Sequence, residues 1–129
     1  MRDSSSNPEL PGDFRIVAVR NGAAGTALLA VSGDADLHSA PQLRESIRDA
    51  IDEGSTTLVL DLSETTFVDS TALGVLLGGM KRLREHDGRI RLVVPRPEVR
   101  RVFEITMLDR IFPLHETRDE ALAAVDAAV

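Results

Sequence analysis

Residues 58–84 read LVLDLSETTFVDSTALGVLLGGMKRLR and contain two different periodicities in one continuous stretch. Leu58 to Leu62 is a short apolar run bounded by turn formers, which predicts a buried strand. From Asp69 onward the spacing becomes helical, with one apolar face. That face is made by Leu73, Leu76, Leu77, Met80 and Leu83. The stretch therefore predicts a buried strand, a polar turn and a helix that packs on a sheet.

The residues before this stretch predict a hairpin and a first helix. Residues 14–19 alternate apolar and polar as a half-buried strand does, Asn21-Gly22 with Gly25 marks a reversal, and residues 26–32 predict the returning strand. Ser39 and Gln42 have the spacing of a capping box, so a helix is expected from there to the stop at Gly54.

The residues after it continue the alternation of strands and helices. The expected elements are a strand at 89–94, a helix opening at Pro97, a short strand at 111–114 and a helix at 117–127 begun by a capping box of Thr117 and Glu120. Residues 1–12 are rich in Ser, Pro and acid and are expected to be a flexible tail, leaving 13–129 as one domain. The prediction is an α/β fold: a mixed central sheet of four to five strands covered by about four helices.

The composition excludes several classes of function. The chain has 129 residues, no cysteine and a formal net charge of −6. Disulfides and thiolate metal sites are therefore excluded, and the acidic balance disfavours direct nucleic-acid binding. No apolar run approaches the length of a membrane span and residues 1–13 lack the apolar core of a secretory signal, so a cytoplasmic location is expected.

Asp69, Ser70 and Thr71 stand side by side where the second helix begins. All three residue types cap helices, and capping alone could explain them. However, three such residues exceed what one helix end needs, and an exposed serine beside free N–H groups suits a phosphate. The same helix carries Gly74, Gly78 and Gly79 despite a cost of about 1 kcal/mol each relative to alanine. Close approach of another backbone would explain them, either the sheet beneath or a partner above.

Three segments together resemble the STAS domain family, in particular its stand-alone bacterial anti-anti-sigma factors (anti-sigma factor antagonists). They are VSGDAD at 31–36, the strand, loop and helix at 60–76, and the strand-to-helix segment at 95–108. The resemblance implies that Ser70, or less favourably Thr71, is phosphorylated by an anti-sigma factor that is an ATP-dependent serine kinase. The unphosphorylated domain would bind this kinase and release a sigma factor, and a metal-dependent serine/threonine phosphatase would reverse the modification. It further implies a non-enzymatic, STAS-type single domain without cofactor or metal. Its partner-binding residues would be Asp34, Asp36, His38, Asp69, Thr71, Gly74, Val75 and Gly78.

Other functions fit the sequence less well. A serine hydrolase is disfavoured because Ser70 lacks the Gly-x-Ser-x-Gly context. A metal site at Asp34, Asp36 and His38 matches no ligand spacing, so a solvated acidic turn is expected there. Arg96, Arg100 and Arg101 are expected to form a solvated helix face rather than a phosphate or RNA site. Within the family, the remaining alternative is a scaffold subunit of a stress-sensing complex or an adaptor of a lipid-transport ATPase. A role as part of an anion transporter is excluded by the lack of membrane spans.

Overall fold

A computed structural model describes residues 13–19 and 25–127, and it contains one five-stranded sheet with four α-helices. In chain order the elements are β1 (Arg15–Val19), β2 (Thr26–Ala35), α1 (Ala40–Asp52), β3 (Thr57–Val68), α2 (Ser70–Arg84), β4 (Arg89–Val93), α3 (Pro97–Ile105), a 3₁₀ helix (Leu108–Arg110), β5 (Leu114–His115) and α4 (Arg118–Ala127). This confirms the predicted α/β class and the count of strands and helices.

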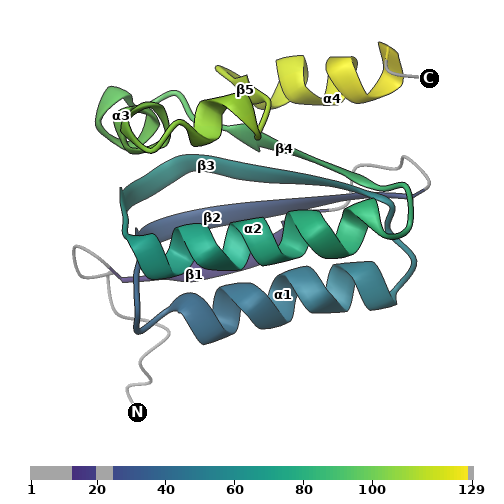
Figure 1. Cartoon of the computed structure of the whole chain (residues 1–129), viewed down its shortest axis with the longest axis horizontal. Coiled ribbons are helices and arrows are strands. Elements are labelled where there is room, and N and C mark those ends of the chain that lie inside the picture. Colours follow the sequence, from purple (N-terminus) through teal and green to yellow (C-terminus); the bar gives the residue numbers. More distant parts are fainter. Residues whose placement is uncertain (1–12, 20–24, 128–129) are drawn as a thin grey trace.

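The strands lie in the sheet in the same order as in the chain. β1 and β2 are antiparallel and form the predicted hairpin, whereas β2, β3, β4 and β5 are all parallel. Parallel neighbours need crossover connections, and α1 and α2 supply two of them. Both helices lie side by side on one face of the sheet, and α4 lies on the opposite face (Figure 1). Because β2 and β3 are parallel, the helices that follow them, α1 and α2, begin at the same end of the molecule.

The core explains why β3 reads as a continuous apolar run. Leu58, Leu60 and Leu62 pack in the larger core cluster under α1 and α2, while Val59 faces Val93 and Ala121 on the α4 side. A central strand of a parallel sheet is covered on both faces, so both sets of side chains are apolar. Burying each such leucine contributes about 1.5–3 kcal/mol. The α1–α2 face is therefore the main source of stability and fixes where α2 begins.

The predicted polar turn after Leu62 is wrong. β3 stays extended through residues 63–66 to Val68, and β2 continues to Ala35 instead of ending at Ser32. The two long strands pair along their whole length, with register shifts between Ala30 and Ser32 and between Gly33 and Asp34. The buried Thr65 hydroxyl donates to the Val31 carbonyl at 3.0 Å, and β-branched threonines suit a strand. Long-range pairing thus overrides the local turn signal.

Two local predictions near the helix ends also need correction. Ser39 does not form a capping box with Gln42, because its hydroxyl points back into the loop before α1. The last strand begins at Leu114 rather than Ile111, which is exposed beyond the 3₁₀ helix. The box of Thr117 and Glu120 is half confirmed: the Glu120 N–H donates to Thr117 Oγ1, but the Glu120 carboxylate accepts from the N–H of Glu116, one residue earlier than predicted.

Two predictions lie outside the described residues, namely the tail at 1–12 and the reversal at Asn21-Gly22. Within the described ranges, no helix combines the length and the apolar character that a membrane crossing requires.

Candidate functional site

Asp69 is the N-cap of α2 and connects that helix to the loop between β2 and α1. Its Oδ1 accepts from the N–H of Ala72 at 3.0 Å, and its backbone carbonyl accepts from the N–H of Leu73. Its second oxygen, Oδ2, accepts from the N–H of Leu37 at 3.0 Å, across 32 residues of sequence. Both carboxylate oxygens are therefore engaged inside the protein. The extended backbone of Asp69 lets the chain leave β3 and enter α2 directly.

Ser70 is the first residue of α2, and its side chain is exposed. Among the described residues, neither its hydroxyl nor its N–H has a hydrogen-bond partner, and the same holds for the half-buried Thr71. The free N–H groups of a helix's first turn carry partial positive charge. The sequence offered Asp69, Ser70 and Thr71 as possible helix caps. The structure shows that Asp69 is the cap, and the Ser70 hydroxyl is left free.

The loop between β2 and α1 is built by acidic side chains that bind its own backbone. Asp36 Oδ1 accepts from the N–H groups of His38 at 2.9 Å and Ser39 at 3.1 Å. The Ser39 hydroxyl in turn accepts from the Asp36 N–H and donates to the Asp34 carbonyl, both at 2.8 Å. These hydrogen bonds, the one from the Ser39 backbone first, lower the pKa of Asp36 despite its partial desolvation. The loop is therefore a rigid turn beside Ser70.

The predicted acidic residues come together around the start of α2. Asp34 lies on β2 next to β3, where its Oδ1 accepts from the Thr66 hydroxyl at 2.8 Å. Asp36 is in the turn that follows. The Asp69 carboxylate reaches the same turn, where it accepts from the N–H of Leu37. The His38 side chain is exposed. We call Asp34, Asp36, Asp69 and Ser70 the switch end. The described part of the chain contains no cluster of three His, Asp or Glu side chains placed to hold a metal ion.

The glycines of α2 divide into two kinds. A Cβ on Gly79 would lie 3.0 Å from Cγ2 of Ile47, so this glycine permits the close approach of α1. A Cβ on Gly74 or Gly78 would meet nothing within 4 Å, and both positions are exposed. The sheet and α1 therefore explain Gly79 only. Val75, expected on the same small face, is only 6% exposed and lies between α1 and α2.

Two exposed apolar side chains near Ser70 were missed by the sequence reading. Leu37 is 64% exposed in the loop whose N–H reaches Asp69, and Phe67 is 51% exposed opposite Asp34 in the β2–β3 ladder. Strict alternation along β3 would place Phe67 on the same face as the buried Thr65, so the sequence carried no signal for its exposure. The alternation is broken where the β2–β3 register shifts between Gly33 and Asp34, and Thr66 and Phe67 are both exposed there. Leu37 had no sequence signal, since it stands alone between acidic and polar residues.

The arginines of α3 differ from the expectation of a solvated face. Arg96 Nε donates to the Ser63 carbonyl at 2.9 Å and Arg100 Nε donates to the Val94 carbonyl at 3.1 Å. Arg100 also pairs with Glu116 at 3.2 Å. Arg101 alone is exposed as predicted. Two of the three side chains therefore anchor α3 on the sheet rather than form an anion site.

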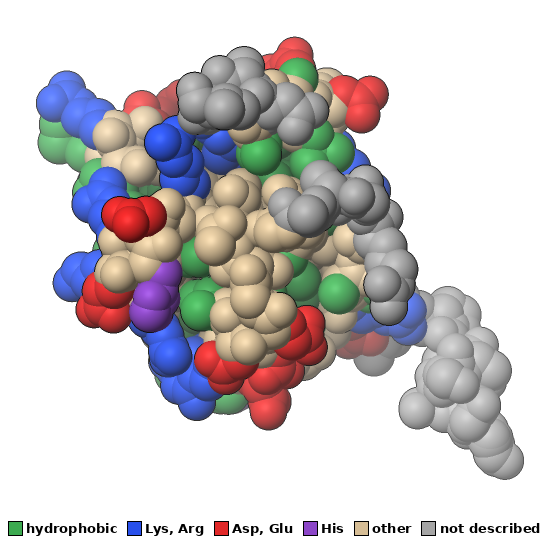
Figure 2. All heavy atoms as spheres, turned by 90° about the vertical axis from the view of Figure 1, so that its right-hand side faces the viewer, with side chains coloured by type: hydrophobic (Ala, Val, Ile, Leu, Met, Phe, Trp, Pro, Cys, Tyr) green, Lys and Arg blue, Asp and Glu red, His purple; other side chains and the backbone are tan. Residues whose placement is uncertain are grey.

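The end of the molecule opposite Ser70 differs in electrostatic character. α1 and α2 both end there, so their free carbonyls carry partial negative charge (Figure 1). In Figure 2, which faces this end, Asp and Glu side chains gather along the lower edge and Lys and Arg side chains along the left. The last turn of α2 carries three basic residues, Lys81, Arg82 and Arg84, whose positive charge suits the negative helix end.

Comparison with known proteins places this geometry in context. The family model of the STAS domain matches residues 16–121. The putative anti-sigma factor antagonist BtrV of Bordetella bronchiseptica is 33% identical over 81% of this chain and 90% of its own. The crystal structure of an anti-sigma factor antagonist from Mycobacterium paratuberculosis superposes with a TM-score of 0.82 at 31% identity, covering 92% of this chain and 99% of that one. The Bacillus cell fate determinant SpoIIAA in the phosphorylated form has a TM-score of 0.66 at 30% identity, covering 88% and 99%.

Proposed function

The chain belongs to the STAS domain family, and on that premise we propose that it is an anti-sigma factor antagonist switched by phosphorylation of Ser70. Unphosphorylated, it binds an anti-sigma factor that is also an ATP-dependent serine kinase and thereby releases a sigma factor. The kinase phosphorylates Ser70 and ends the interaction, and a metal-dependent serine/threonine phosphatase restores it. The cycle takes place in the cytoplasm, and the chain itself contributes no catalytic group.

The observation that carries this proposal is the free, exposed hydroxyl of Ser70 at the first position of α2. A kinase needs a hydroxyl that is accessible and not engaged in the fold, and Ser70 meets both conditions. Thr71 also has a free hydroxyl, but it is half-buried. A phosphate on Ser70 would face the unpaired N–H groups of the helix start, which tolerate its charge. The fold can therefore survive the modification.

The surroundings of Ser70 support a switch that acts by charge. A phosphoserine adds nearly two negative charges next to three carboxylates, those of Asp34, Asp36 and Asp69. A kinase site that holds nucleotide phosphates would repel such a surface, because like charges placed together cost several kcal/mol. The exposed Leu37, Phe67, Gly74 and Gly78 supply apolar and sterically open contact area around the hydroxyl. These residues, with His38, are the proposed docking surface.

Incubation with candidate anti-sigma kinases and ATP, followed by mass spectrometry of the peptide containing residues 69–71, tests the acceptor. We expect one phosphate on Ser70, none on Ser70→Ala, and continued phosphorylation of Thr71→Val. Phosphate found only on Thr71 would overturn the choice of acceptor.

Titration of the same kinases with charge variants tests the switch. We expect Ser70→Asp to unfold at the same temperature as the unmodified chain yet to bind at least about 100-fold more weakly. The matched control is Ser55→Asp, which places the same charge before β3 at the opposite end. If Ser70→Asp bound as well as the control, the chain would act as a constitutive adaptor or scaffold instead.

A further inference from the structure

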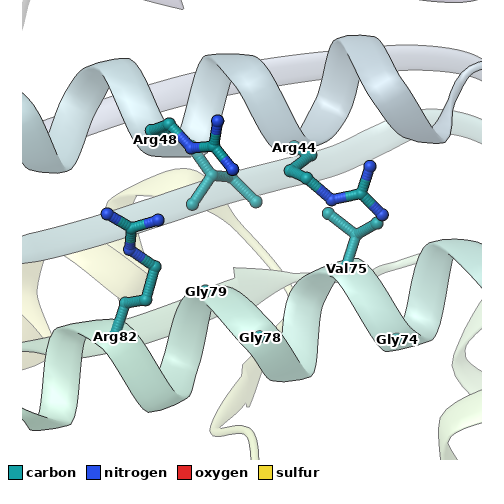
Figure 3. A pocket seen from close by; sticks show the side chains of 8 residues that line it. Arg44, Arg48, Gly74, Val75, Gly78, Gly79 and Arg82 are labelled. Atoms are coloured by element: carbon teal, nitrogen blue, oxygen red, sulfur yellow. The ribbon is translucent and has the colours of Figure 1, made fainter.

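Three arginines line a groove between α1 and α2. Arg44 and Arg48 come from α1 and Arg82 from α2, and in Figure 3 their side chains extend over the space between the two helices. The floor is formed by Ile47 and Val75, with Gly74, Gly78 and Gly79 along α2. The groove has a volume of about 330 Å³ and is open to solvent. We call it the arginine groove.

The charges of the arginine groove have no partner within the described part of the chain. None of the three guanidinium groups makes an ion pair or a side-chain hydrogen bond there. Acidic residues are not scarce, since the chain has 21 Asp and Glu against 15 Lys and Arg. Arg44 and Arg48 are one helical turn apart on α1, a spacing at which like charges destabilise a helix. The fold therefore maintains a local positive surface that its own acids do not neutralise.

The three arginines are spread along the groove rather than gathered around one position. Residues four apart on a helix lie about 5–6 Å from each other along the axis, so Arg44 and Arg48 have room to bind two separate carboxylates. Carboxylates spaced one turn apart on a second polypeptide match this spacing. The glycines of the groove favour binding of a polypeptide. A Cβ on Gly74 or Gly78 would meet nothing within 4 Å, so the backbone of a bound segment can approach α2 closely.

The arginine groove is also continuous with the switch end. Gly74 follows Ser70 by one helical turn on α2, so a partner that covers Ser70 reaches the first glycine of the groove. The combined surface is acidic at one end and basic along its length. Such a pattern fixes the orientation of a partner and accelerates its association.

We propose that the arginine groove binds an acidic segment of the anti-sigma partner, with carboxylates one helical turn apart, while Ser70 faces the partner's kinase site. This inference rests on the proposed function. The groove supplies affinity and orientation that do not depend on the phosphorylation state of Ser70. A partner can therefore be repelled at Ser70 and still be recognised along α1 and α2.

The first experiment uses a model peptide and is independent of the kinase. A helix-forming peptide of about twelve residues with glutamates one turn apart is titrated into the ¹⁵N-labelled full chain. We expect amide shifts at residues 74–79, weakening of at least about tenfold in Arg44→Glu/Arg48→Glu, and little change in the control Arg101→Glu/Arg110→Glu, which has the same net charge. The same shifts are expected in Ser70→Asp.

No shift in the groove, or equal weakening by the control pair, would overturn the proposal. Shifts produced equally by inorganic phosphate at matched ionic strength would replace it with a free-anion site.

The second experiment uses the kinase and separates the two proposals. If Arg44→Glu/Arg48→Glu slows association about tenfold at low salt while Ser70 is still phosphorylated at saturating kinase, the groove and the switch both stand. If this pair associates as fast as the control pair, the groove proposal fails and the proposed function survives. If no kinase binds the unmodified chain but the peptide occupies the groove, the proposed function fails and the acidic-segment site stands with another partner.

Discussion

The switch end and the arginine groove lie next to each other on α2, yet they use charge in opposite ways. At the switch end, Asp36 and Asp69 bind backbone N–H groups and so build the loop and the helix start. In the arginine groove, Arg44, Arg48 and Arg82 bind nothing in the described chain. The acidic charges are part of the fold, whereas the basic charges are available to a partner. Substitutions of Asp36 or Asp69 should therefore cost stability, whereas substitutions of the three arginines should cost binding.

The largest effect on stability is expected for Asp69→Ala. It removes the N-cap of α2, worth about 0.5–2 kcal/mol, and the bond to the Leu37 N–H, worth about 0.5–1.5 kcal/mol. A total loss of about 2 kcal/mol is large against an ordinary stability of about 5–15 kcal/mol. Urea unfolding measures it directly.

The control for this prediction is Arg44→Gln/Arg48→Gln from the arginine groove. Asp69→Asn is a second reference, since its remaining oxygen still accepts one of the two N–H groups and its loss should be smaller. Equal urea midpoints for Asp69→Ala and the arginine pair would break the distinction between the two regions.

The next largest effect separates the glycines of α2. Gly78→Ala should stabilise the chain by about 0.5–1 kcal/mol, because alanine is the better helix former and its Cβ meets nothing. Gly79→Ala brings the same gain but places a Cβ 3.0 Å from Cγ2 of Ile47. Such overpacking costs about 1–3 kcal/mol. Thermal unfolding should therefore rank Gly78→Ala above the unmodified chain and Gly79→Ala below Gly78→Ala. The reverse order would mean that α1 moves away from α2 at no cost.

These two regions also show what the sequence can predict. The leucine spacing of α2 and the caps at 69–71 placed the helix start within one residue, because both signals are local. The bond from Asp69 to Leu37 joins residues 32 apart, and the exposure of Phe67 depends on the pairing of β3 with β2. Nothing local encodes either. The arginine groove was missed for the same reason, since Arg44 and Arg82 become neighbours only when two crossovers place their helices side by side.

A smaller effect is expected from the arginines themselves. Arg44→Gln/Arg48→Gln removes a like-charge pair one turn apart, so the chain should gain about 0.2–0.5 kcal/mol at low ionic strength. The gain should disappear in molar salt, where the Debye length falls to about 3 Å. Thermal unfolding at two salt concentrations measures it. A loss of stability at both would show that the guanidinium groups have an internal role, and the groove would then resemble the switch end.

The smallest effect concerns the pH dependence of the loop before α1. The pKa of Asp36 is lowered from its ordinary value of 3.8, first by the hydrogen bond from the Ser39 backbone N–H. A carboxylate with a lowered folded-state pKa contributes stability that is fully present above the unfolded pKa and is lost as the pH falls through the folded one. The stability difference between the unmodified chain and Asp36→Asn should therefore be constant from pH 7 to about pH 5 and should shrink below about pH 4.

Urea midpoints measured in steps of pH test this, with Arg44→Gln/Arg48→Gln as the control. That pair should differ from the unmodified chain by the same amount throughout, because arginine does not titrate in this range. A pH-independent difference for Asp36→Asn would mean that the carboxylate does not hold the loop, and the loop's charges would then be as free for a partner as those of the arginine groove.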